Sequence, residues 1–225
     1  MESKSSRPSP TIEDYLGVIY TLERDGQTVI GVRLAEWLEV SAPTVTATLK
    51  RMVRDGWVVM DPSKEIHLTA SGRKAATSLI RRHMLTELLL ARVLGISWSR
   101  VHQEADEMEH TISGETVSAL LSRLDEPQTC PHGNPLPGHE ELLKDWVPLT
   151  ETPKGSRVII QRIHESVENK PQAMVFLESQ GIMPGAEAWV EDVIPLNETM
   201  TLRVEGRLVV LGLAIARAVH VQPLD

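Results

Sequence analysis

Apolar residues in the first part of the chain follow the spacing of amphipathic helices. Within residues 11–24, Val18, Ile19 and Leu22 recur at helical intervals and predict a first helix. The same reasoning predicts a second helix over residues 32–38. The chain therefore opens with two helices rather than with a sheet.

A third helix and a short hairpin follow. Ser41 is a favoured N-cap residue and Pro43 is tolerated in a first turn, so a helix is predicted from Ser41 to about Arg54. Apolar runs at residues 57–60 and 66–68, separated by a polar turn, predict two short strands. Helix, short turn, helix and hairpin is the order of a winged helix-turn-helix.

The middle of the chain is predicted to be helical and to end in a linker. Residues 69–94, 97–111 and 113–124 show helical patterning, and serines open the last two segments. Residues 125–154 contain six prolines, which favours an irregular connection.

Short β-type runs replace the helical pattern after this linker. A helix is predicted at residues 171–179, and strands are predicted at residues 157–163, 187–193, 200–204, 207–211 and 218–221. We therefore expect a mainly α protein with a small β module. Its domains are predicted at residues 1–75, 76–150 and 151–225.

Composition narrows the class of protein. The chain is 41% hydrophobic and carries a net charge of −8, and it contains no apolar run long enough to span a membrane. The first third balances acidic and basic residues, whereas the middle third is acidic. The Ser/Pro-rich residues 1–10 are expected to be disordered and not to form a secretory signal, and one cysteine excludes a disulfide framework. These features predict a cytoplasmic protein.

The third helix has the side chains of a DNA-recognition helix. Small hydroxyl residues near its start suit close approach to bases, and basic residues further along suit phosphates. The predicted DNA contacts are Arg33, Ser41, Pro43, Thr44, Thr46, Ala47, Lys50, Arg51, Arg54 and Lys64. The alternative is a helical hairpin with a solvated basic face.

Metal-ligand side chains cluster on the helix predicted at residues 97–111. His102, Asp106, Glu109 and His110 stand at i, i+4, i+7 and i+8, within an arc of about 100° that borders the apolar face. Burying two carboxylates together is costly, so we expect a nearby cation to offset their charge. Alternatively, these acidic residues form ordinary surface ion pairs with arginines.

Two further positions extend this hypothesis. His83 and Glu87, at i and i+4, face the same side of the preceding helix. Asp14 is either a first-turn acid stabilised by the helix dipole or a ligand from the DNA-binding domain. Imidazole and carboxylate ligands suit Mn(II), Fe(II), Co(II) or Zn(II). Cys130, His132 and His139 lack a paired spacing, so we interpret them as incidental to metal binding.

Several motifs together resemble the diphtheria-toxin-repressor family of metal-dependent transcriptional regulators. They are TIEDYL (11–16), SAPTV (41–45), RMVRDG (51–56), LTASG (68–72), HMLTE (83–87), HQEADEMEH (102–110) and GNPLPG (133–138). Residues 176–185 and 212–221 resemble the SH3-like (FeoA-like) β-barrel of longer members. The resemblance implies a homodimer that represses metal-uptake genes through operator DNA.

The resemblance also implies two metal sites per subunit. The primary site would use Asp14, Asp106, Glu109 and His110, and the ancillary site would use His83, Glu87 and His102, with Glu168 and Gln172 as the nearest candidates from the SH3-like domain. Iron-responsive members carry Met and Cys where this chain has Asp14 and Asp106, whereas manganese-responsive members carry acids. Mn(II) is therefore the expected metal and Fe(II) the alternative, although Gly17 replaces a second manganese-type ligand.

Two rival functions remain open. Glu107 and His110 match the Glu-x-x-His element of helical-bundle metalloenzymes, but the sequence offers no second copy of it. A winged-helix regulator that responds to something other than metal is the other alternative.

Overall fold

The computed structural model describes residues 8–224, so residues 1–7 of the predicted disordered segment lie outside the described residues. The chain divides into two compact units, one up to Arg82 and one from His83 onward, which we call the N-terminal and C-terminal units. The boundary falls inside one long helix. Among the described residues, no helix combines the length and apolar character needed to cross a bilayer.

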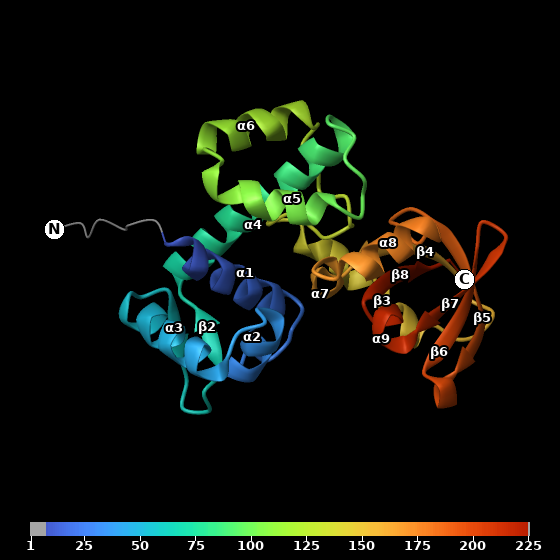
Figure 1. Cartoon of the computed structure of the whole chain (residues 1–225), viewed down its shortest axis with the longest axis horizontal. Helices are drawn as coiled ribbons and strands as arrows, with labels where there is room; N and C mark the ends of the chain where they lie inside the picture. The colour runs from blue at the N-terminus through green and yellow to red at the C-terminus, as the bar shows by residue number, and fades with distance from the viewer. Residues whose placement is uncertain (1–7, 225) are drawn as a thin grey trace. The chain divides into compact units, whose positions relative to one another are not determined.

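The N-terminal unit is a winged helix-turn-helix (Figure 1). Its elements are α1 (Pro10–Arg24), α2 (Gly31–Trp37), α3 (Ala42–Arg54), β1 (Val58–Met60), β2 (Ile66–Leu68) and the first part of α4 (Ala70–Arg92). Ser41 caps α3 as predicted, since its side chain accepts a hydrogen bond from the Thr44 amide. Buried apolar residues of α1, α3 and the hairpin form one core. The position of α3 is therefore fixed by this shared core and by its contacts with α2 and β1.

A buried ion pair joins α1 to α4 within this unit. Nη2 of Arg82 lies 2.9 Å from Oε1 of Glu13, and both side chains are almost fully buried. Since a buried charge is costly without its partner, this contact holds the two helices in one register.

The C-terminal unit begins with the second part of α4 and a small helical segment. This segment contains α5 (Val101–Met108), η1 (Glu109–Thr111), α6 (Gly114–Arg123) and η2 (Glu140–Asp145). The helix predicted from Ser97 begins only at Val101, because Ser97 and Ser99 donate to Oε2 of Glu178 at 2.8 and 2.6 Å instead of entering the helix.

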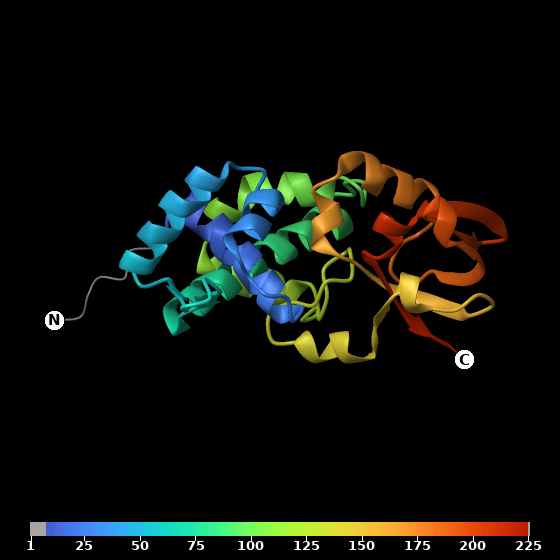
Figure 2. The same ribbon diagram turned by 90° about the horizontal axis from the view of Figure 1, so that it is seen from below.

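The predicted β strands are all present in the C-terminal module, residues 147–223. Its elements are β3 (Val147–Pro148), η3 (Leu149–Glu151), β4 (Arg157–Ile163), α7 (Glu165–Glu168), α8 (Pro171–Ser179), β5 (Glu187–Ile194), η4 (Pro195–Asn197), β6 (Thr199–Val204), β7 (Arg207–Gly212), α9 (Leu213–Ala216) and β8 (Val219–Pro223). The antiparallel sheet has the order β3-β8-β4-β5-β6-β7. Figure 2 shows α7 and α8 following each other beside this sheet.

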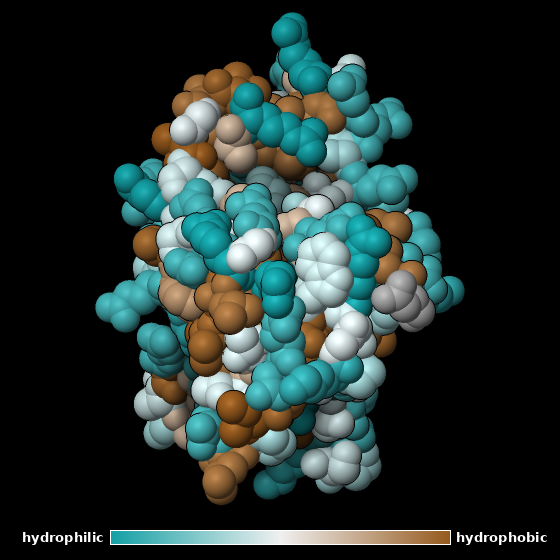
Figure 3. All heavy atoms as spheres, turned by 90° about the vertical axis from the view of Figure 1, so that its right-hand side faces the viewer, coloured by the Kyte–Doolittle hydropathy of each residue, from teal (hydrophilic) through white to brown (hydrophobic). Residues whose placement is uncertain are grey.

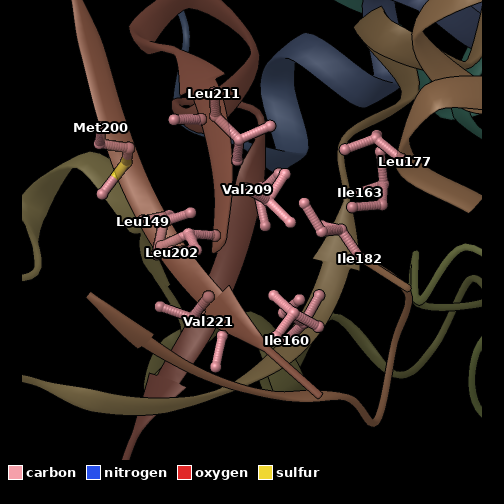
Figure 4. Packing of buried hydrophobic residues seen from close by; sticks show 14 of the residues in the cluster. Leu149, Ile160, Ile163, Leu177, Ile182, Met200, Leu202, Val209, Leu211 and Val221 are labelled. Atoms are coloured by element: carbon pink, nitrogen blue, oxygen red, sulfur yellow. The ribbon is translucent and has the colours of Figure 1, made fainter. Parts of the chain in front are cut away.

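Alternation along the strands builds the core of this module. Met200, Leu202 and Val204 of β6 are buried while the residues between them are more exposed. They pack with residues of β4, β7, β8 and α8, several of which are drawn in Figure 4. On the outside, seen in Figure 3, apolar and hydrophilic atoms are intermixed. The module is thus a small β-barrel-like fold with its own core.

The proline-rich segment predicted as a linker is packed rather than free. Cys130, His132 and Asn134 are buried, and a β-bridge pairs Thr129 with Pro135. The amide of Ile163 on β4 donates to the carbonyl of His132 at 2.8 Å. This segment, residues 129–136, is therefore a structural loop that docks on the C-terminal module.

Candidate functional site

The predicted ancillary ligands come together in the C-terminal unit. Nε2 of His83 lies 3.1 Å from Oε1 of Glu87 and 3.0 Å from Nδ1 of His102. His83 and Glu87 are one turn apart on α4, as their spacing predicts, and α5 brings His102 against them. Nδ1 of His102 lies 3.0 Å from Oε2 of Glu168, which is buried at the end of α7. Ligand atoms of these four residues all lie within 4.8 Å of one another.

Of the two candidates from the C-terminal module, the structure brings only Glu168 into this group. Gln172 lies in the first turn of α8, and its side chain is exposed. A neighbouring amide approaches instead, since Oδ1 of Asn169 lies 3.1 Å from Nε2 of His102.

Two buried members of this cluster, Cys130 and His132, were not expected from the sequence to be metal ligands. Nδ1 of His132 lies 3.2 Å from Oε1 of Glu87 and 3.3 Å from Oε1 of Glu168. Cys130, His132 and Glu87 offer ligand atoms within 4.8 Å of one another. A Cys-Pro-His sequence directly before a glycine is the local signal that could have identified them, because such a turn can aim both side chains the same way. His139 lies elsewhere, half-exposed and 3.9 Å from Glu141.

Burial and neighbouring charges shift the pKa values of this cluster in opposite directions. Burial alone lowers the pKa of His83, but Glu87, Asp106 and Glu109 outweigh it and hold the pKa well above its ordinary value. Burial likewise raises the pKa of Glu87, but the surrounding imidazoles of His132, His83 and His102 hold it well below its usual range. The metal-free cluster is thus stabilised by charge pairing between imidazolium and carboxylate groups.

The donor set and two unsatisfied atoms fit a metal ion. Oε2 of Glu87 and Nδ1 of His132 are buried and make no well-directed hydrogen bond among the residues that the structure describes, although Nδ1 lies 3.2 and 3.3 Å from oxygens of Glu87 and Glu168. Nε2 of His132 donates to the carbonyl of Trp98 at 3.0 Å, which leaves Nδ1 as the atom that faces the carboxylates. A cation at this position would satisfy both atoms, and nitrogen, oxygen and sulfur donors suit divalent transition metals.

The predicted primary ligands on α5 and η1 adjoin the same histidine. Nδ1 of His83 lies 3.2 Å from Oδ1 of Asp106 and 2.9 Å from Oε2 of Glu109, and His110 lies 3.5 Å from Glu109. The α-helix ends at Met108 and gives way to the 3₁₀ turn η1, so the helical arc predicted through His110 holds only in part. Asp14 lies on α1 in the N-terminal unit with an exposed side chain, and its place in the primary site stays a prediction.

The predicted DNA contacts are all exposed on the N-terminal unit. Thr44, Thr46 and Ala47 lie on the outer side of α3, opposite the buried Val45 and Leu49. Some basic groups already have partners within the chain, because Arg51 donates to Ser9 at 2.8 Å and Arg54 to Asp55 at 2.8 Å. The amphipathic recognition helix expected from the sequence is therefore present.

A winged helix-turn-helix joined to a histidine–carboxylate centre defines a metal-dependent DNA-binding regulator. Family models match residues 9–66 as the iron-dependent repressor N-terminal DNA-binding domain, residues 69–138 as its metal-binding and dimerisation domain, and residues 147–223 as a FeoA domain. The chain belongs to the iron-dependent, or diphtheria-toxin, repressor family, whose members are metal-dependent transcriptional repressors.

Relatives of known name cover almost the whole chain. The iron-dependent repressor IdeR of Mycobacterium leprae is 37% identical over 211 residues, which covers 85% of this chain and 92% of the relative. The diphtheria toxin repressor of Corynebacterium diphtheriae is 34% identical and covers 95% of this chain and 97% of the relative. A solved manganese-dependent transcriptional repressor in complex with manganese has a TM-score of 0.82 at 30% identity, covering 95% of this chain and all of that one.

Proposed function

We propose that the protein is a manganese-responsive repressor that binds operator DNA as a homodimer and controls metal-uptake genes in the cytoplasm. The observation that carries the metal assignment is the oxygen-rich donor set next to His83, formed by Asp106 and Glu109 at 3.2 and 2.9 Å. Asp106 is a carboxylate where iron-responsive members carry a thiolate, and hard oxygen donors favour Mn(II).

We assign two metal sites. Following the family resemblance, the primary site consists of Asp14, Asp106, Glu109 and His110. The ancillary site consists of His83, Glu87, His102 and Glu168, and we include Cys130 and His132 as further candidate ligands because they form a second group with Glu87. The bound ion would supply the positive charge that offsets these carboxylates.

The switch depends on how rigidly α1 carries Asp14. Glu13, its neighbour, is paired with Arg82, and the buried side of α1 packs with α3 in one core. A constraint applied to Asp14 is therefore passed to the recognition helix. In a homodimer, fixing α3 fixes the separation of the two recognition helices, and half-sites about 34 Å apart can then be contacted together. The coupling is reciprocal, so operator DNA should tighten metal binding by the same factor.

The test is DNA binding to fragments of metal-transporter promoters, titrated separately with Mn(II) and, under anaerobic conditions, with Fe(II). Fluorescence anisotropy should show DNA binding only when a metal ion is present, and Mn(II) should be sufficient to produce it. Asp14→Ala should abolish this metal dependence, whereas Asp192→Ala, which removes a half-exposed acid paired with Lys154 in the C-terminal module, should leave it unchanged. Equal DNA affinity with and without metal would remove the proposal.

An iron-responsive repressor is the second candidate. It is favoured by the relatives named iron-dependent and by the buried thiol of Cys130, a softer donor. Activation by Fe(II) at a lower free concentration than Mn(II) would select it. The metalloenzyme alternative gains no support, since Glu107 is exposed and the carboxylate beside His83 is that of Glu109.

A further inference from the structure

The loop of residues 129–136 is held against β4 so closely that one position requires glycine. Gly133 has φ +87°, and a Cβ atom there would lie 1.9 Å from the carbonyl oxygen of Gln161 and 2.8 Å from Cα of Arg162. The pairing of β4 with β8 shifts register between Ile160 and Arg162, the mark of a β-bulge. The bulge and the loop therefore meet at one point of the C-terminal unit.

Arg162 faces inward at this bulge and contacts Asn134. It is only 2% exposed, the largest of the fully buried side chains. Its Nη2 lies 2.8 Å from Oε2 of Glu165, which offsets its charge, and its Nε donates to Oδ1 of Asn134. Because a guanidinium can only donate, this bond fixes which end of the Asn134 amide is the oxygen.

The other end of the same amide points at Glu168. Nδ2 of Asn134 donates to Oε1 of Glu168 at 2.6 Å and to the carbonyl of Ile163 at 2.8 Å. Both donor hydrogens are used, and the side chain is wholly buried. Oε1 of Glu168 is thereby occupied, while Oε2 lies 3.0 Å from Nδ1 of His102. Asn134 thus determines the direction in which the Glu168 carboxylate faces.

We propose that Asn134, anchored by Arg162, is a positioning residue that presents Glu168 of the C-terminal module to the ancillary metal site. The proposal rests on the proposed function, because it requires that this site bind a metal. It adds a residue that is not itself in the ligand set. Hydrogen-bond partners of metal ligands typically change affinity by roughly 10- to 100-fold when they are lost. The primary site contains neither Asn134 nor Glu168 and should be unaffected.

The test compares Asn134→Ala, Glu168→Ala and the double variant in the full-length protein. Co(II) is the probe, since its visible spectrum reports ligands and titration gives affinity. His102→Ala identifies which binding step belongs to the ancillary site. Each single variant should weaken that step by roughly 10- to 100-fold, with the same altered spectrum. The double variant should show no further loss, because both changes remove one contribution.

The control is Gln161→Ala, which alters a half-buried side chain on the same strand that is hydrogen-bonded to Gln222. It should bind Co(II) as the unaltered chain does. If Asn134→Ala does not fold, Asn134→Ser replaces it in the same titrations. Serine keeps a polar group at this buried position but is too short to reach Glu168.

Two results would overturn the positioning role alone: unaltered ancillary affinity in the Asn134 variant, or additive losses in the double variant. If the unaltered chain bound no metal, the proposed function would fail together with this proposal. The two failures are therefore distinguishable.

Discussion

Nδ1 of His132 lies 3.2 Å from Oε1 of Glu87, and both side chains are wholly buried. Glu87 comes from α4 and His132 from the proline-rich loop, so this contact joins a helix to a segment that the sequence presents as a linker. The same loop carries Cys130, which adds a sulfur atom to an otherwise nitrogen and oxygen donor set. With this thiol, the proposed ancillary site would combine sulfur with nitrogen and oxygen donors.

Replacing Cys130 by serine should change metal preference. Loss of the thiol should weaken Fe(II), Co(II) and Zn(II) at the ancillary site more than Mn(II), because softer ions gain most from sulfur. Competition titrations of the Cys130→Ser variant against the unaltered chain measure this ratio. The control is Ser118→Ala, which alters an exposed serine on α6. An equal effect on all four ions would show that the thiol is not a ligand.

Metal affinity should rise with pH. The pKa of His83 and that of His102 are held well above the ordinary value of 6.5 by nearby carboxylates that outweigh burial, which favours protonated imidazole at this pair in the metal-free chain. Binding must displace these protons. Calorimetry in buffers of different ionisation enthalpy should detect proton release, and a pH-independent affinity would contradict the prediction.

The free energy of unfolding of the metal-free chain should fall as pH rises above neutrality, in contrast to the metal affinity. Because the pKa of His83 is raised on folding, its stabilising contribution is complete below 6.5 and is lost as pH rises through the higher folded value. The pKa of Glu87 is lowered, so its contribution is present above 4.5 and is lost as pH falls through the lower folded value. Thermal melts of the metal-free protein should therefore show a decline on the alkaline side, which saturating metal reverses.

The buried pair of Glu13 and Arg82 should dominate local stability in the N-terminal unit. Arg82→Met leaves the Glu13 carboxylate buried without this partner and should cost about 3–5 kcal/mol. The double variant with Glu13→Leu should be less destabilised than the single variant. Urea unfolding measures both, and Arg54→Ala, which breaks an exposed pair with Asp55, should leave the free energy of unfolding almost unchanged. A milder loss in Arg82→Met than in the double variant would refute the coupling.

Lys64 should contribute to DNA affinity without contributing to sequence choice. It is exposed in the turn between β1 and β2, where a wing reaches phosphates. Lys64→Ala should weaken binding about uniformly across operator sequences and reduce the salt dependence by about one unit of slope. Salt-dependent anisotropy measures this, with Lys154→Ala in the C-terminal module as the control. A change in operator preference would instead assign Lys64 to base contacts.

Local signals in the sequence predicted most of the elements. Ser41 caps α3, the strand over Arg157–Ile163 has the predicted bounds, and the alternation in β6 appears as burial in the structure. The i, i+4 spacing of His83 and Glu87 likewise predicted their contact, because helix geometry alone places such residues together.

Other features depend on contacts between segments distant in sequence. Glu178 takes Ser97 and Ser99 out of the predicted helix, and the 3₁₀ turn at Glu109–Thr111 alters the expected ligand arc. No local pattern contains this information, since Glu178 lies about 80 residues from the serines that it binds.

The sequence by itself indicated the class of fold, the recognition helix and the candidate imidazole and carboxylate ligands, because the spacing of residues within one helix is set by its backbone period. Only the tertiary structure brought Cys130 and His132 to them, selected Glu168 over Gln172, and led to the proposal that Asn134 orients Glu168. The physical reason is that a metal centre assembled from loops and helices depends on packing between segments, where a buried polar group must find a partner wherever the fold supplies one.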